Sequence, residues 1–537
     1  MTVNVPCLVA VILMYLLVLV IGVVTAKKTH KSQNSEEVMI ANRSLGFGVA
    51  FFTLTATMVC GGFINGTAEF AAWHGLLQTQ APIGYCIGFF LSGIFFAPKL
   101  RREKYITMFD PFQFKYGRKM GSLLIFPHLF GDVFWSATVL ASLGATVSII
   151  VDLDPTLSII VSALVAVIYT FLGGLYAVAY TDVIQLILVA IGLVVACPFA
   201  MTDQHVNLDN ITSTWVGEVK SGTEWLYLDT YCLLILGGTT VQPFYQRILA
   251  CKSARVAVIS TCMASLFSFL LSIPAFIIGV AGSAADWNST DYTGPLPIPE
   301  ERRSHILPMT LSYLVPLPVS IIGLGAISAA SMSSADSCFL STATVITKNI
   351  YKDIFRNNAS DRELMWILRI FIVISGTAGT VIAIYATSIY GLFVLCSDLL
   401  YVILFPQMIG VLWIRLTNTY GMVSGFVVAL IIRILSGDPT LNIPAVIKYP
   451  LYEEETGTQL FPFRTFCMAC GFVVLIAASA LTNFLFSNDY LSIKYDIFNC
   501  RRQRSHQNRN WSKDPPSLGA EDALLKLQDM KSNGSGK

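Results

Sequence analysis

The sequence predicts an all-α polytopic membrane protein of about 13 transmembrane helices, built as two inverted five-helix repeats whose first helices are broken. Two observations carry this prediction: a series of long apolar segments, and glycine-rich interruptions in two of them. Hydrophobic residues make up 54% of the 537 residues and charged residues only 13%, whereas soluble domains carry about 25% charged residues. A net charge of +2 gives no sign of nucleic-acid binding, and no catalytic motif appears, so we expect no enzyme active site.

The apolar segments are each long enough to cross a bilayer, which takes ~20 residues. The first, Val5 to Thr25, lacks a basic start and a cleavage site, so we expect a retained span rather than a signal peptide. The others begin near Leu45, Ala81, Ser122, Thr156, Val183, Trp225, Val256, Ile306, Trp366, Tyr390, Gly421 and Thr465.

Basic residues set the expected orientation. Lys/Arg clusters follow the first, third, seventh, ninth and thirteenth segments. Because such clusters collect in the cytoplasm, we predict an extracellular N-terminus and a cytoplasmic C-terminus. We further expect the protein to lie in the plasma membrane. Two glycosylation sequons, at Asn210 and Asn288, fall on the opposite side.

The expected organisation follows from these segments. Residues 1–43 hold the first span and a cytoplasmic loop, and residues 420–486 hold the last two spans. The two repeats are 44–203 and 204–419. Residues 487–537 form a cytoplasmic, largely disordered tail. We expect membrane lipid to surround the spans.

The interruptions lie in the second and seventh segments, at Gly61-Gly62 and at Gly237-Gly238 with Pro243. The two segments start five apart, an odd number, so they cross in opposite directions. This predicts inverted repeats in which broken helices expose backbone groups that bind substrate and ions near the bilayer midplane. The alternative is ordinary glycine-mediated helix packing.

A serine-lined helix carries an acid within the ninth segment. Ser333, Ser337 and Ser341 recur every four residues and share one helix face, beside Asp336. An acid inside a span costs at least ~2.5–3.5 kcal/mol, and hydroxyl and carboxylate oxygens suit an alkali cation. Alternatively, the hydroxyls bond back to their own helix. Asp182 is either an end-of-helix acid or part of a second ion site.

Asp132 and Trp135 lie one helical turn apart in the fourth segment. An acid and an indole facing the same way suit an organic cation. The alternative is a buried acid satisfied by a neighbouring helix beside a core tryptophan.

Several motifs resemble the sodium/solute symporter family. They are Tyr169–Ala177, Tyr180–Gln185 and Ser331–Ser334, and further phrases such as Phe63–Glu69 and Gln80–Tyr85 are most similar to its choline-carrying branch. The resemblance implies a LeuT-like fold and sodium-driven import of choline, or a related small organic cation, by alternating access. It further implies a role in supplying acetylcholine synthesis, and a chloride requirement whose site the sequence does not place.

The resemblance also implies site residues. The main sodium site would use carbonyls of Ala56, Val59 and Ala330 with hydroxyls of Ser333 and Ser334, and a second site would use Asp182, Asp336 and Ser337. The substrate would lie among Met58, Tyr85, Asp132, Trp135 and Val241. Met58 and Val241 replace two tryptophans of the family, so the alternatives are a symporter of the same fold for another solute, or a non-transporting sensor or channel.

The tail contains Glu521-Asp-Ala-Leu-Leu525, which resembles a dileucine signal for trafficking adaptors. The alternative is a solvated tail without such a partner.

Overall fold

The computed structural model describes residues 35–498, except 152, 173, 208–214, 387, 439–440, 442, 456 and 489, together with residues 6–9, 12, 13, 16 and 20. Most of the expected first span, the sequon at Asn210 and the trafficking signal at Glu521–Leu525 lie outside the described residues. Asn288 is exposed in a short helical turn, Trp287–Ser289, and its glycosylation stays a prediction.

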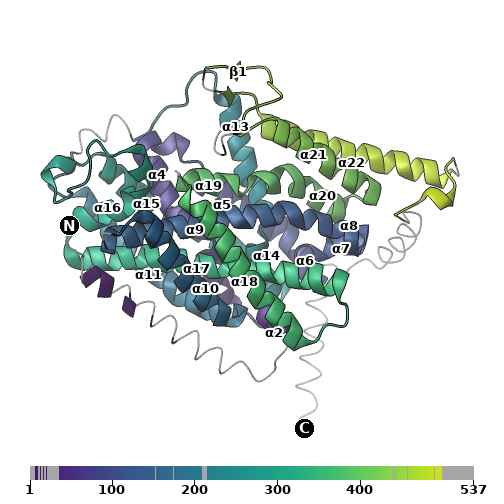
Figure 1. Cartoon of the computed structure of the whole chain (residues 1–537), viewed down its shortest axis with the longest axis horizontal. Helices are drawn as coiled ribbons and strands as arrows, with labels where there is room; N and C mark the ends of the chain where they lie inside the picture. The colour runs from purple at the N-terminus through teal and green to yellow at the C-terminus, as the bar shows by residue number, and fades with distance from the viewer. Residues whose placement is uncertain are drawn as a thin grey trace, which may run out of the picture.

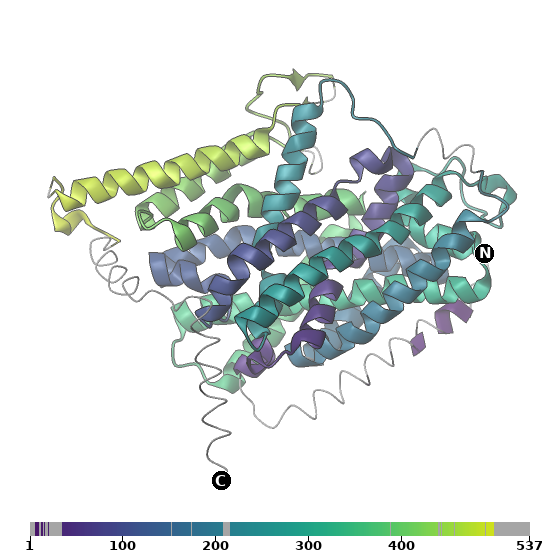
Figure 2. The same ribbon diagram turned by 180° about the vertical axis from the view of Figure 1, so that it is seen from behind.

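The described chain is almost entirely helical (Figures 1 and 2). The α-helices are α2 Ser35–Ile40, α3 Phe47–Met58, α4 Gly61–Gln78, α5 Ala81–Leu91, α6 Ala97–Arg102, α7 Asp110–Tyr116, α8 Arg118–Gly121, α9 Ile125–Val151, α10 Pro155–Leu172, α11 Leu175–Met201, α13 Glu224–Cys232, α14 Gln242–Ala250, α15 Ala254–Ser283, α16 Ile306–Tyr313, α17 Leu317–Val345, α18 Asp361–Ile384, α19 Ile389–Leu395, α20 Phe405–Trp413, α21 Thr419–Leu435 and α22 Phe463–Ser487.

Short 3₁₀ and π turns extend or join these helices, and the strands form one small hairpin. The turns are η1 Ala41–Arg43, η2 Ser92–Phe96, η3 Ser122–Leu124, η4 Leu233–Gly237, η5 Gly238–Thr240, η6 Trp287–Ser289, η7 Glu300–His305, η8 Ile346–Phe355, η9 Leu400–Leu404 and η10 Ile493–Tyr495. Strand β1, Tyr452–Glu453, pairs antiparallel with β2, Thr458–Gln459.

Within the described residues, eight helices are long and apolar enough to cross a membrane, and the bent pair α3 and α4 makes a ninth. The multi-span α-helical prediction is therefore confirmed. The exact number of 13 spans stays a prediction, because several of the expected spans are broken or short.

The break in the second segment lies at Val59 and Cys60, where the chain bends by 47° between α3 and α4. Gly61 and Gly62 follow this break, and neighbouring side chains leave no room for a Cβ at either position. A Cβ on Gly61 would lie 1.9 Å from Ser331 Oγ, and one on Gly62 would lie 2.1 Å from Thr138 Cγ2. Broken backbone and glycine-mediated packing, the two alternatives for this segment, therefore occur together.

The seventh segment is broken too. Helix α13 passes through η4 and η5 into Val241, whose backbone is extended (φ −96°, ψ 109°), before α14 begins. Pro243 lies in the first turn of α14, where a missing N–H costs little.

Two expected boundaries are wrong. The sixth span begins at Leu175 rather than Val183, so Asp182 lies two turns inside α11 and not at its end. The ninth span begins at Leu317 rather than Ile306, because Pro316 separates the short α16 from α17.

Helix α17 occupies the centre of the molecule. It packs against α11, α9, α18 and α3, and every residue from Ala326 to Val345 is buried. Helices α21 and α22 form a hairpin at one edge (Figures 1 and 2). The serine-lined face therefore looks inward to protein rather than outward to lipid.

We expect Gly279→Ala to destabilise the protein by about 1–3 kcal/mol, the usual cost of overpacking. A Cβ there would lie 2.4 Å from the Ala68 carbonyl oxygen, so α15 would be forced away from α4. Gly325→Ala is the matched control, because nothing lies within 4 Å of its Cβ position. Thermal unfolding of the purified protein in detergent tests this, and equal midpoints for the two variants would contradict it.

Candidate functional site

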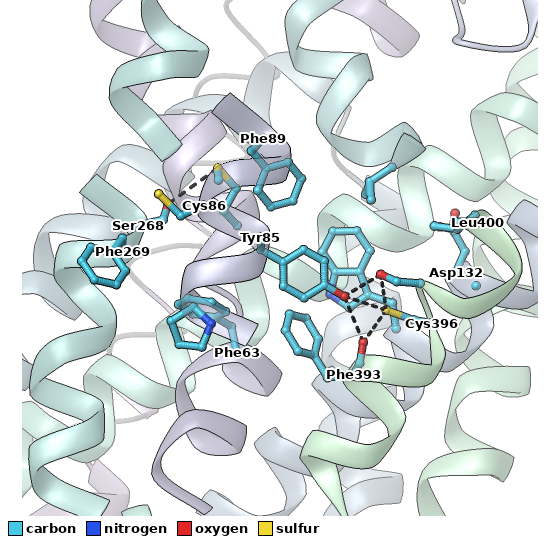
Figure 3. A pocket seen from close by; sticks show the side chains of 16 residues that line it. Phe63, Tyr85, Cys86, Phe89, Asp132, Ser268, Phe269, Phe393, Cys396 and Leu400 are labelled. Atoms are coloured by element: carbon cyan, nitrogen blue, oxygen red, sulfur yellow. Dashed lines mark hydrogen bonds between the residues drawn. The ribbon is translucent and has the colours of Figure 1, made fainter. Parts of the chain in front are cut away.

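A cavity lies where the two broken helices face α5, α9, α15 and α19 (Figure 3). It surrounds about 520 Å³ of space free of protein atoms, counting its open mouth. The lining residues are Met58, Phe63, Pro82, Tyr85, Cys86, Phe89, Gly131, Asp132, Trp135, Val241, Ser268, Phe269, Phe393, Cys396, Ser397 and Leu400.

All five expected substrate residues line this cavity: Met58, Tyr85, Asp132, Trp135 and Val241. Met58 ends α3, Tyr85 lies on α5, and Asp132 and Trp135 lie on α9. Val241 lies in the break before α14. The structure thus brings together residues that are far apart in the sequence.

Aromatic rings dominate the cavity wall. Besides Tyr85 and Trp135, four phenylalanines line it, namely Phe63, Phe89, Phe269 and Phe393. The Tyr85 ring centroid lies 4.9 Å from that of Phe393 and 5.7 Å from that of Phe89. Ring faces attract cations, so this wall suits a positively charged organic molecule.

Sequence reasoning missed the four phenylalanines. They belong to four different helices of a chain that contains 34 phenylalanines. No spacing pattern links such residues, because only the tertiary fold brings them to one wall. Phe63 alone lay within a motif that the sequence analysis had singled out.

Asp132 is the one carboxylate among the residues that line the cavity. Thr342 donates a hydrogen bond to its Oδ2 at 2.6 Å, and His128 Nε2 lies 3.1 Å from the same oxygen. The acid is therefore held by a neighbouring helix, as one alternative predicted, and it also faces the cavity, as the other did.

The Tyr85 hydroxyl forms a polar corner with α19. It lies 2.5 Å from Ser397 Oγ and donates to the Phe393 carbonyl at 3.2 Å. Figure 3 shows Tyr85 near the middle of the cavity, with dashed lines that link its hydroxyl to the chain around Phe393 and Cys396. These contacts fix the ring against α19.

A second polar cluster joins α3, α11, α14 and α17. Asp182 accepts hydrogen bonds from Ser333 Oγ at 2.5 Å and from Thr53 Oγ1. Asp182 is fully buried. Because Ser333 lies on α17 and Thr53 on α3, its carboxylate connects the centre of α17 to the first half of the broken second span.

Arg247 supplies the positive charge of this cluster. Its Nη2 donates to Ser337 Oγ at 2.5 Å and lies 3.7 Å from Asp182 Oδ2, and its Nε donates to Thr53 Oγ1 at 3.3 Å. Sequence reasoning missed this role: Arg247 belongs to the Lys/Arg cluster after the seventh segment, which was used only to set the orientation. Its place on α14, just after the second break, was the available signal.

Asp336 has a hydrogen bond on one oxygen only. Thr170 Oγ1 donates to its Oδ1 at 2.7 Å, and its Oδ2 has no hydrogen-bond partner among the described residues. The hydroxyls of Ser334 and Ser337 donate to their own helix, to the carbonyls of Ala330 and Ser333 at 3.0 and 2.8 Å. The helix thus combines back-bonded serines with an incompletely satisfied acid.

Ala56 and Val59 lie at the end of α3, which packs against α17. The last carbonyls of a helix have no intrahelical donor. Carbonyl oxygens of this kind are ligands that a hard cation accepts.

Helix α4 also contacts the start of α19. Glu69 accepts hydrogen bonds from Ser388 Oγ at 2.6 Å and from the N–H groups of Ile389 and Tyr390 at 3.2 and 3.3 Å. The Phe70 and Tyr390 rings stack with centroids 3.7 Å apart. These contacts join the second half of the broken second span to the start of the eleventh expected span.

Comparison with known proteins gives consistent matches. Residues 38–429 match the Sodium:solute symporter family. The chain is 47% identical to a high-affinity choline transporter of Drosophila melanogaster, over 93% of this chain and 82% of that protein. It is 42% identical to a high affinity choline transporter of Homo sapiens, over 96% of this chain and 91% of that protein.

Among solved structures, a Na+-coupled sialic acid symporter in a substrate-bound outward-open state matches with a TM-score of 0.70. The two are 19% identical, and the match covers 90% of this chain and 98% of the other. This likeness confirms the expected fold class.

We expect Arg247→Met to destabilise the protein by about 3–5 kcal/mol, because Asp182 would remain as a buried charge without its partner. The double variant Asp182→Asn/Arg247→Met removes both charges and should recover most of that loss. Thermal unfolding in detergent measures both. A double variant no more stable than Arg247→Met alone would contradict the pairing.

Proposed function

Because the chain belongs to the sodium:solute symporter family, we propose that this multi-pass membrane protein imports choline, driven by sodium, by alternating access. The observation that carries the proposal is the cavity between the broken helices. Six aromatic rings and one carboxylate line it, and relatives that are 42–47% identical over at least 92% of this chain are named as high-affinity choline transporters.

The cavity chemistry supports a quaternary ammonium cargo. Such a cation has no N–H to donate, so its recognition rests on ring faces, at roughly 0.5–2 kcal/mol each, and on a nearby negative charge. Tyr85, Trp135 and Phe393 supply rings, and Asp132 supplies the charge. Met58 adds a polarizable sulfur, while Val241 adds only apolar surface.

For sodium, we propose the main site at the carbonyls of Ala56, Val59 and Ala330 and the hydroxyls of Ser333 and Ser334. The end of α3 and the middle of α17 pack together, so a cation between them would tie the broken second span to the central helix. Binding that differs between the outward-open and inward-open states is what couples the ion to transport.

A second sodium at Asp182, Asp336 and Ser337 requires a rearrangement. Arg247 donates to Ser337 and faces Asp182. In this conformation its guanidinium therefore supplies the positive charge that a sodium ion would bring to these side chains. We propose that sodium reaches this cluster only in states in which Arg247 leaves Ser337.

The transport cycle uses contacts on both sides of the cavity. Separation of Glu69 from the start of α19 would open the cavity outward, and separation of Arg247 from α17 would open it inward. The extracellular N-terminus, plasma-membrane residence, a chloride requirement and a supply of choline for acetylcholine synthesis belong to the same proposal. No described residue is assigned to chloride.

A second candidate is a sodium symporter of the same fold for a different small solute. Met58 and Val241 favour it, because they line the cavity where more rings would tighten choline binding.

Uptake of labelled choline by cells that express the chain separates the two. Saturable uptake in sodium that is absent in lithium supports choline import. A protein at the cell surface that takes up no choline would overturn the proposal and favour the second candidate.

We expect Ser334→Ala to raise the sodium concentration for half-maximal uptake about tenfold, because one oxygen ligand is lost. Ser328→Ala is the matched control: it is a buried serine on the same helix whose hydroxyl has no partner among the described residues. Uptake measured against sodium concentration tests this. Equal sodium curves for both variants would refute the main site.

We expect Met58→Trp to lower the choline concentration for half-maximal uptake by about 2- to 30-fold, the value of one added ring face. Val241→Trp in the same chain should lower it further. Met58→Leu, which keeps the size without a ring or sulfur, should not. The assignment fails if Met58→Trp reaches the surface and binds choline no more tightly than Met58→Leu.

A further inference from the structure

The cavity contains a hydrogen-bond donor without a partner. Trp135 lines the cavity and is only 7% exposed, and its Nε1–H has no hydrogen-bond partner among the described residues. The Cys60 thiol lies beside it, but sulfur is a weak acceptor. A buried donor left unpaired is costly, so the cargo is the natural source of an acceptor.

The same helix offers an open acceptor one turn away. Thr342 and His128 both contact Oδ2 of Asp132, and its Oδ1 has no hydrogen-bond partner among the described residues. Asp132 and Trp135 are three residues apart on α9, so their side chains lie on the same face.

The other polar groups of the cavity wall are already satisfied. The Tyr85 hydroxyl contacts Ser397 and donates to the Phe393 carbonyl. The Ser268 hydroxyl donates to the Ala264 carbonyl at 2.7 Å. The open donor and acceptor on α9 therefore remain for the cargo to complete.

A hydroxyl group fits this pair, because it accepts one hydrogen bond and donates another. A primary ammonium donates but cannot accept, and a quaternary ammonium does neither. We propose that the cavity recognises a hydroxyl of the cargo, whose oxygen accepts from Trp135 Nε1 and whose proton is donated to Asp132 Oδ1. This inference rests on the proposed function, and it assigns discrimination of the cargo's hydroxyl to Trp135 and Asp132.

The test compares choline with propyltrimethylammonium, in which a methyl group replaces the hydroxyl. Each compound competes with labelled choline for uptake, and each is also tested for thermal stabilisation of the purified protein in sodium. In the wild-type protein we expect choline to bind about 10- to 100-fold more tightly than the isostere, because the isostere leaves both groups unpaired.

Trp135→Phe keeps an aromatic face and removes the N–H. We expect it to weaken choline binding while leaving isostere binding unchanged, so the preference falls to about threefold or less. Phe269→Leu is the matched control, because it removes a ring of the same cavity without touching the donor. It should weaken both compounds equally and leave the preference intact.

A second measurement needs no variant. O-methylcholine accepts a hydrogen bond but cannot donate one, so it should bind the wild-type protein between choline and the isostere. If it binds no better than the isostere, or if Trp135→Phe weakens choline and isostere equally, the inference is wrong. If the wild-type protein binds both compounds alike, the inference is wrong while choline import stands. If it binds neither, the proposed function itself fails.

Discussion

The structure depends on one constraint: backbone groups inside a membrane need partners, and lipid supplies none. Two spans are interrupted, at Val59-Cys60 and around Val241, so their free carbonyls and amides must face protein, cargo or ions. The remaining spans surround these interruptions. The cavity is the consequence, because it is the space that both broken helices share.

Buried charged side chains need partners for the same reason. Asp182, Asp336 and Arg247 lie among the hydroxyls of Thr53, Thr170, Ser333 and Ser337, with one negative charge in excess of the positive if both acids ionise. A cation between α3 and α17 would offset that excess. At the proposed second site, sodium and Arg247 would act on the same set of oxygens, which would link ion binding to the position of the broken helix α14.

The spans and their breaks could be predicted from the sequence, because both leave local signals in it. Apolar length gave the spans, and Gly61-Gly62 and Gly237-Gly238 marked the breaks. The resemblance placed the five residues that meet at the cavity. Arg247 and the four phenylalanines could not be found, because their roles come from contacts between distant helices. The start of α11 was misplaced because Thr181 and Asp182 interrupt the apolar run, although the helix begins before them, at Leu175.

The central claim is that sodium and choline bind one conformation together, through the two broken helices. Choline binding to the purified protein, measured over a range of sodium concentrations, tests it most directly. The account predicts that sodium tightens choline binding, and that choline tightens sodium binding by the same factor, because coupling is reciprocal. Choline affinity that is the same in sodium and in lithium would contradict it.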